Sequence, residues 1–97
     1  MATKIIMYTG ENCGKCKRAK EMLNNLPPDI EVELIERNVD KNTAHMDTLK
    51  HVINSSSLPT FVIPKSEKGC DLYNKDTYHL YIGFDENIGK IMEVLGL

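Results

Sequence analysis

The chain has 97 residues, 41% of them hydrophobic and 27% charged, with a net charge of −2 at pH 7. This length suits a single domain, and the composition is that of a globular protein rather than a disordered one. The small net charge gives no reason to expect a nucleic acid or a membrane surface as partner. The first apolar run is too short for a signal peptide, so we expect a cytoplasmic protein. We also expect it to be a monomer.

The spacing of apolar and polar residues predicts seven elements in chain order. An apolar strand at residues 4–9 ends at Gly10, and a helical stripe follows at residues 16–26, before two prolines. An alternating strand at residues 31–36 precedes a helix at residues 40–53. Strands follow at residues 60–63 and 78–82, and a last helical stripe runs over residues 88–95. Asp85 is the expected N-cap of that helix, and Gly96 suits the position just past its end.

The predicted order is therefore β-α-β-α-β-β-α, which indicates an α/β fold. The first two strands are joined through a helix, so they should be parallel with a right-handed crossover. The last two are joined by a loop and should form an antiparallel hairpin. Together these elements predict a four-stranded mixed sheet with helices on both faces.

The most informative motif is a Cys-x-x-Cys pair, Cys13-Gly14-Lys15-Cys16, which follows the first strand and opens the first helix. The first turn of a helix carries unpaired backbone N–H groups and the positive end of the helix dipole. Both favour a thiolate over a thiol at Cys13. Residues 13–20 also contain four basic residues and no acid, which strengthens this preference.

The positions of the two cysteines suggest different roles. Three residues along a helix place Cys16 on the same side as Cys13, within reach of a disulfide. We expect Cys13 at the exposed tip and Cys16 more deeply buried, because Cys16 begins the apolar stripe. Cys13 would then attack a substrate disulfide, and Cys16 would resolve the mixed disulfide that forms.

Other uses of the cysteine pair stay open at this point. One is a non-catalytic zinc or iron–sulfur module that uses the same cysteines, with Cys70 and His79 completing a zinc site, although no second pair has zinc-ligand spacing. Another is a partner-docking domain whose cysteines are unreactive. A phosphate-binding loop is disfavoured, because three residues rather than four separate Gly10 from Gly14. We expect no bound metal and no bound organic cofactor.

Three segments together resemble the glutaredoxin branch of the thioredoxin-fold family. They are the strand–Cys-Gly-Lys-Cys–helix unit at residues 4–26, Ser-Leu-Pro-Thr at residues 57–60, and Gly-Phe-Asp-Glu at residues 83–86. The resemblance covers nearly the whole chain. It implies one glutaredoxin-like domain over residues 1–97, with a thioredoxin-like fold of four strands flanked by three helices.

The resemblance also implies two binding segments. A cis bond before Pro59 would shape a substrate groove and leave the backbone of Leu58 free to pair with an extended substrate. Gly83, Asp85 and Glu86 would lie at the site that holds the amino end of glutathione.

A third implied contact concerns the carboxylates of glutathione. Many family members bind one with a lysine shortly before the first cysteine, where this chain has Gly10 and Glu11. Lys15, which stands where the family often has a tyrosine, or Arg37 is expected to take that role.

The implied activity is thiol–disulfide oxidoreduction, in which the dithiol reduces disulfides in proteins or mixed disulfides with glutathione. Ribonucleotide reductase is a recipient typical of the family and is implied by the resemblance alone. Glutathione is the expected electron donor, with a flavoprotein disulfide reductase as the alternative.

The segment at residues 64–77 is longer than an ordinary hairpin loop. It contains Cys70, Tyr73 and three lysines. The simpler interpretation is a solvated loop. The alternative is a contact specific to one partner, or regulation by addition of glutathione to Cys70.

Overall fold

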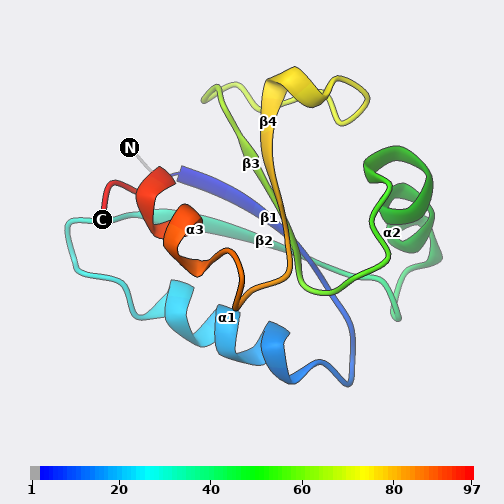
Figure 1. Cartoon of the computed structure of the whole chain (residues 1–97), viewed down its shortest axis with the longest axis horizontal. Helices are drawn as coiled ribbons and strands as arrows, with labels where there is room; N and C mark the ends of the chain where they lie inside the picture. The colour runs from blue at the N-terminus through cyan, green and yellow to red at the C-terminus, as the bar shows by residue number, and fades with distance from the viewer. Residues whose placement is uncertain (1–2) are drawn as a thin grey trace.

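The structure is a computed structural model that describes residues 3–97 (Figure 1). Its elements are β1 (Thr3–Thr9), α1 (Gly14–Asn24), β2 (Val32–Asn38), α2 (Thr43–Thr48), the π-helical turn η1 (Leu49–Ile53), β3 (Thr60–Pro64), the 3-10 turn η2 (Lys75–Thr77), β4 (Tyr78–Ile82) and α3 (Ile88–Val94). The predicted order of strands and helices is confirmed. Over residues 3–97 no helix has the length and apolar character needed to cross a membrane.

The four strands form one mixed sheet in the order β2-β1-β3-β4. β1 and β2 are parallel, with Ile5 opposite Leu34, as expected for strands joined by a helix. β3 is antiparallel to both β1 and β4, with Phe61 opposite Tyr81 in the second pair. The predicted parallel pair, hairpin and mixed sheet are therefore confirmed.

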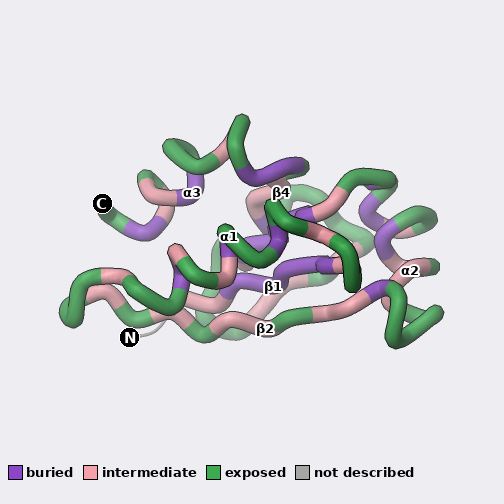
Figure 2. The backbone as a smooth tube through the Cα atoms, turned by 90° about the horizontal axis from the view of Figure 1, so that it is seen from below, coloured by how far each residue is buried: buried purple, intermediate pink, exposed green. Residues whose placement is uncertain are grey.

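The central strands β1 and β3 are covered on both faces, and this explains their continuous apolar sequences. On one face Ile5, Met7 and Phe61 pack in a cluster with residues of α1 and α3. On the other face Tyr8 and Val62 pack in a second cluster with residues of η1. Figure 2 shows the buried stretch of β1 running through the middle of the molecule, and Figure 1 shows α1 and α3 together, apart from α2.

The second helix begins later than predicted, at Thr43 rather than residue 40. The side chain of Asn38 accepts hydrogen bonds from the backbone N–H groups of Asp40 and Lys41, at 2.9 and 3.2 Å. This local side-chain turn competes with helix formation. The Asn42 side chain then caps the helix by accepting from the N–H of Ala44.

The last helix begins at the first residue of its predicted apolar stripe, but Asp85 is not its N-cap. The N-cap is Asn87, and the α3 helix starts at Ile88. The backbone N–H of Asn87 donates to the carbonyl of Phe84, which makes residues 84–87 a turn. Asp85 lies in that turn with its carboxylate engaged elsewhere, whereas Gly96 does take a left-handed conformation past the helix end, with φ 83°.

The segment between β3 and β4 is largely exposed, as expected for a solvated loop, and hydrogen bonds within the segment shape it. The single hydroxyl proton of Thr77 is shared between the carbonyls of Asp71 and Asn74, at 2.9 and 2.7 Å, and the hydroxyl oxygen accepts from the N–H of Asp71 at 3.0 Å. Cys70 and Leu72 pack against the second core cluster. Tyr73 points outward and is 85% exposed.

Candidate active site

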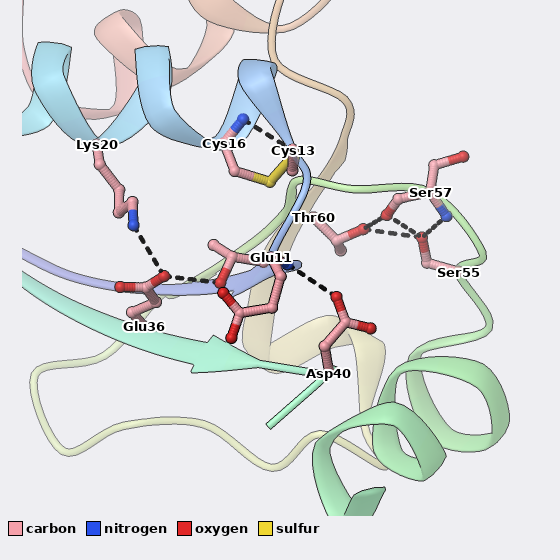
Figure 3. Close-up of a disulfide and its surroundings, with 10 residues drawn as sticks. Glu11, Cys13, Cys16, Lys20, Glu36, Asp40, Ser55, Ser57 and Thr60 are labelled. Atoms are coloured by element: carbon pink, nitrogen blue, oxygen red, sulfur yellow. Dashed lines mark hydrogen bonds and ion pairs between the residues drawn. A yellow bond between two sulfur atoms is a disulfide. The ribbon is translucent and has the colours of Figure 1, made fainter. Parts of the chain in front are cut away.

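Cys13 and Cys16 form a disulfide at the start of α1, with their Cα atoms 5.2 Å apart (Figure 3). Cys13 is the N-cap of the helix, and its sulfur accepts a hydrogen bond of 3.1 Å from the N–H of Cys16. Cys13 is half-buried, whereas Cys16 is only 2% exposed. The expected difference in exposure between the two thiols is therefore present.

A polar cleft of about 530 Å³ opens beside the disulfide. Besides both cysteines it is lined by charged and amide side chains and by the loop before the helix: Gly10, Glu11, Asn12, Gly14, Lys17, Lys20, Glu36, Asn38 and Lys41. Two of the lysines are paired with acids of the cleft, Lys20 with Glu36 at 3.1 Å and Lys41 with Glu11 at 3.7 Å. The charges near the disulfide are thus largely balanced, and Lys17 lies among them.

Glu36 links three elements next to this cleft. Its carboxylate accepts a hydrogen bond of 2.8 Å from the hydroxyl of Thr9 on β1, and it pairs with Lys20 on α1 (Figure 3). The Thr9 hydrogen bond, with smaller help from Lys20, holds the pKa of Glu36 below its ordinary value of 4.5 despite the opposing effect of burial. Glu36 is therefore an anion at neutral pH.

The segment before β3 contains the cis Leu58–Pro59 peptide bond, as the resemblance implied. The carbonyl of Pro59 accepts a hydrogen bond of 2.9 Å from the N–H of Gly83. Gly10 lies so close to this segment that a Cβ there would stand 2.8 Å from Leu58 Cδ1. The absence of a side chain at Gly10 thus lets the loop before the disulfide approach the Leu58–Pro59 segment.

Asp85 lies beside the first helix rather than at the start of the last one. The guanidinium of Arg18 is 3.3 Å from both of its carboxylate oxygens, and the amine of Lys15 is 3.9 Å away. These three side chains are each about half exposed. The structure therefore brings Lys15 and Asp85 together, and it adds Arg18 as the main partner of the carboxylate.

Gly83 and Glu86 also lie together. Gly83 has a φ of 92°, and the Glu86 carboxylate occupies the place where a Cβ at Gly83 would stand. The positive φ favours glycine here, since a side chain would be strained in this conformation, whereas the flexible Glu86 side chain could move aside.

The structure does not bring Cys70 or His79 to the cysteine pair. Cys16 packs in the cluster on one face of the sheet, whereas Cys70 packs against the cluster on the other face. Within residues 3–97 no group of three or more His, Cys, Asp or Glu side chains is arranged to hold a metal ion. Arg37 is likewise engaged away from the disulfide, because its guanidinium donates to the Tyr8 hydroxyl and lies over the ring of Tyr8.

Sequence reasoning missed Arg18, Glu36 and Thr9. A signal for Arg18 was available, because it stands three positions after Lys15 and so shares its face of the helix. Glu36 and Thr9 come from different strands, and their contact depends on how the elements pack, which the local sequence does not encode.

The glutaredoxin family model matches residues 5–66 of the chain. One structure of similar fold is described as a malarial protein, at 15% identity and a TM-score of 0.63, with both chains fully covered. Another is a thioredoxin of Plasmodium falciparum, at 22% identity and a TM-score of 0.62, covering 97% of this chain and 71% of the other. No curated protein matches the chain significantly. At these identities the two structures show a shared fold, whereas the family match covers most of the sequence. The chain therefore belongs to the glutaredoxin family and is a thiol–disulfide oxidoreductase with a thioredoxin-like fold.

Proposed function

We propose that the protein reduces disulfides through the dithiol of Cys13 and Cys16. The observation that carries this proposal is their disulfide at the start of α1, with the first sulfur half-buried and the second covered. A substrate can approach Cys13 directly, whereas Cys16 is placed to react only with a group already attached to Cys13.

The reaction has two exchange steps. The Cys13 thiolate attacks one sulfur of the substrate disulfide, and the other sulfur leaves and takes up a proton. Cys16 then loses its proton and attacks Cys13, which releases the second substrate thiol and forms the intramolecular disulfide. Two electrons pass to the substrate. The N–H of Cys16, already 3.1 Å from the Cys13 sulfur, supports negative charge there during the first step.

Leu58 and Pro59 are proposed to bind the substrate backbone. Within residues 3–97, neither the N–H nor the C=O of Leu58 has a hydrogen-bond partner. An extended peptide laid beside Leu58 would satisfy both groups, in the manner of a strand added to a sheet edge. The close contact between Gly10 and Leu58 supports this placement, because it keeps the segment near the loop that carries Cys13.

Glutathione is the proposed electron donor, since the family acts on disulfide-containing proteins with glutathione. Gly83, Asp85 and Glu86 are proposed to receive its amino end, and Lys15 a carboxylate. Arg18 already neutralises Asp85, so a glutathione amine would have to compete with this guanidinium. Disulfide-containing proteins, ribonucleotide reductase among them, are the proposed recipients, in a reducing compartment such as the cytosol.

Substitution of each cysteine tests the mechanism. Cys13→Ser should abolish disulfide reduction, because no thiolate remains at the more accessible of the two positions. Cys16→Ser should accumulate a mixed disulfide at Cys13, detectable by intact-mass spectrometry. Cys70→Ser is the matched control, because Cys70 packs on the other face of the sheet and should retain activity. Substantial reduction by Cys13→Ser would mean that another group starts the reaction.

A further inference from the structure

Ser55, Ser57 and Thr60, which flank the Leu58–Pro59 segment in the sequence, form a closed ring of hydrogen bonds (Figure 3). The hydroxyl oxygens of Ser55 and Thr60 are 2.8 Å apart, and both residues are buried, at 3% and 0% exposure. The Thr60 hydroxyl donates to the carbonyl of Ser57 at 2.6 Å, and the N–H of Ser57 donates to the Ser55 hydroxyl at 3.3 Å.

The direction of each hydrogen bond in this ring follows from the number of protons. Thr60 has one hydroxyl proton, and the short contact commits it to the Ser57 carbonyl. Its oxygen must therefore accept from Ser55 across their 2.8 Å contact. Ser55 in turn accepts from the Ser57 N–H at 3.3 Å, and its own proton has the Ser57 carbonyl as a second, longer acceptor at 3.4 Å.

The ring determines the orientation of the next peptide group. The Ser57 carbonyl and the Leu58 N–H belong to one planar peptide unit, and in a trans unit they point in opposite directions. This unit is trans, since Leu58–Pro59 is the cis bond found within residues 3–97. Because the carbonyl is held by the fully buried Thr60, the Leu58 N–H is turned away from the ring, and it has no partner in the described chain.

We propose that Ser55 and Thr60 are positioning residues that aim the Leu58 N–H at a backbone carbonyl of an extended peptide substrate. This inference rests on the proposed binding of substrate at Leu58 and adds the groups that orient it. The other end of the segment is held by the hydrogen bond from Gly83 to the Pro59 carbonyl, at 2.9 Å. The segment is thus fixed at both ends, which favours substrates that present a peptide backbone.

The test compares two disulfides that differ in peptide backbone. One is an end-capped pentapeptide whose central cysteine is linked to 2-mercaptoethanol, and the other is bis(2-hydroxyethyl) disulfide. Pre-reduced protein is mixed with each, quenched with acid, alkylated and analysed by mass, which gives a second-order rate constant for each. The selectivity, defined as the ratio of the two constants, cancels any change in the reactivity of Cys13 itself.

Thr60→Val removes the hydroxyl at nearly constant volume and should lower the selectivity at least tenfold. Thr60→Ser keeps the hydroxyl, so its selectivity should lie within about twofold of that of the unsubstituted protein. Ser55→Ala, which breaks the ring at its other hydroxyl, should lower the selectivity in the same direction. If circular dichroism shows that Thr60→Val does not fold, the Ser55→Ala variant alone tests the proposal. Ser56→Ala is the matched control, since Ser56 is exposed and outside the ring.

The outcomes separate this inference from the proposed function. An unchanged selectivity in Thr60→Val and Ser55→Ala, or an equal loss with both disulfides, overturns the positioning role while leaving the dithiol mechanism intact. If the unsubstituted protein reacts with neither disulfide, the proposed function fails and the positioning role fails with it. A loss of selectivity in Thr60→Val that is absent in Thr60→Ser supports both the positioning role and the proposed function.

Discussion

The Asp85 carboxylate matches a family motif for binding glutathione, but in this structure it is paired with two side chains of the same protein. These are Arg18 and Lys15, both on the basic first helix. An exposed ion pair of this kind contributes at most about 1 kcal/mol, so it weakens a competing ligand without excluding it. Arg18 is therefore a candidate modulator of the affinity for glutathione.

Removal of Arg18 should accordingly favour glutathione. We expect Arg18→Ala to lower the apparent KM for glutathione by about two- to fivefold, because Asp85 then keeps only the longer contact with Lys15. The KM is measured from steady-state rates of disulfide reduction at one disulfide concentration and several glutathione concentrations. Lys17→Ala removes the same charge but has no ion pair among the described residues, so it controls for electrostatics at Cys13. Equal effects of the two substitutions would contradict a role for Asp85.

Glu36 gives a pH-dependent contribution to stability. Because the pKa of Glu36 in the folded protein lies below its ordinary value of 4.5, its stabilising interactions are complete above that pH. They are lost as the pH falls through the lowered folded value. The group therefore stabilises the fold at neutral pH and contributes progressively less in acid.

Thr9→Val tests this contribution by removing the largest cause of the shift. The pKa of Glu36 should rise toward its ordinary value, as followed by a carbon-13 titration of the carboxyl group. The free energy of unfolding at pH 7 should fall by about 1 kcal/mol, and the loss should be smaller at pH 3. Thr9→Ser, which keeps the hydroxyl, is the control. A loss that does not depend on pH would indicate packing rather than the hydrogen bond.

At the residue scale, the sequence predicted that the two cysteines lie within disulfide reach, because they are three positions apart at a helix start. It also predicted that Cys16 is the more buried, because Cys16 begins the apolar stripe of the helix. It did not predict that Asp85 would pair with Arg18, or that Ser55 and Thr60 would close a ring around Ser57. These contacts depend on how segments distant in the chain come together. Local spacing carries that information only where both partners lie on one element, as Lys15 and Arg18 do.

At the scale of elements, the helix that precedes the substrate segment ends in an unusual conformation. Residues Leu49–Ile53 form a π-helical turn, and Asn54 follows in the left-handed region, with φ 63°. The N–H of Asn54 donates to the carbonyl of Leu49, as does the N–H of Ser55 at 2.9 Å. Asn54 therefore ends the helix and directs the chain into the hydrogen-bonded ring at Ser55.

Substitutions at Asn54 should separate conformation from side-chain chemistry. Asn54→Ala should lower the free energy of unfolding by about 1 kcal/mol, because alanine is disfavoured in the left-handed region. Asn54→Gly should change it by only a few tenths of a kcal/mol, since glycine adopts this conformation readily. Urea denaturation at pH 7 measures both. An alanine variant as stable as the unsubstituted protein would show that the helix end can rearrange.

The elements themselves were well predicted wherever apolar periodicity was strong. The hairpin strand β4 has the predicted bounds, and both predicted sheet pairings are present. The start of α2 and the N-cap of α3 were misplaced, because short polar side chains and a local turn determine them. The Asn38 side chain accepts hydrogen bonds from two backbone N–H groups ahead of the second helix. The turn at residues 84–87 makes Asn87, rather than Asp85, the N-cap of the third.

At the scale of the whole molecule, the sheet separates the face that holds the disulfide from the face that holds Cys70. The disulfide packs with the cluster that contains α1 and α3, and Cys70 packs with the cluster beneath η1. A mixed sheet buried on both faces keeps these layers apart, so the third sulfur cannot join the first two. Sequence spacing left this question open, because it does not tell which face of the sheet the segment at residues 64–77 covers.

The reactivity of Cys70 tests this separation. Burial raises the pKa of the Cys70 thiol above its ordinary value of 9.0, with a smaller opposing effect from Arg37. In a variant with Cys13→Ser and Cys16→Ser, Cys70 is the sole thiol. Its alkylation by iodoacetamide at pH 7 should be slower than that of free cysteine, and its rate should rise with a midpoint above pH 9.0. Denaturation in urea should restore the rate of free cysteine, which serves as the internal control. A midpoint at or below pH 9.0 in the folded variant would show that the thiol is open to solvent, and would revive Cys70 as a site of modification.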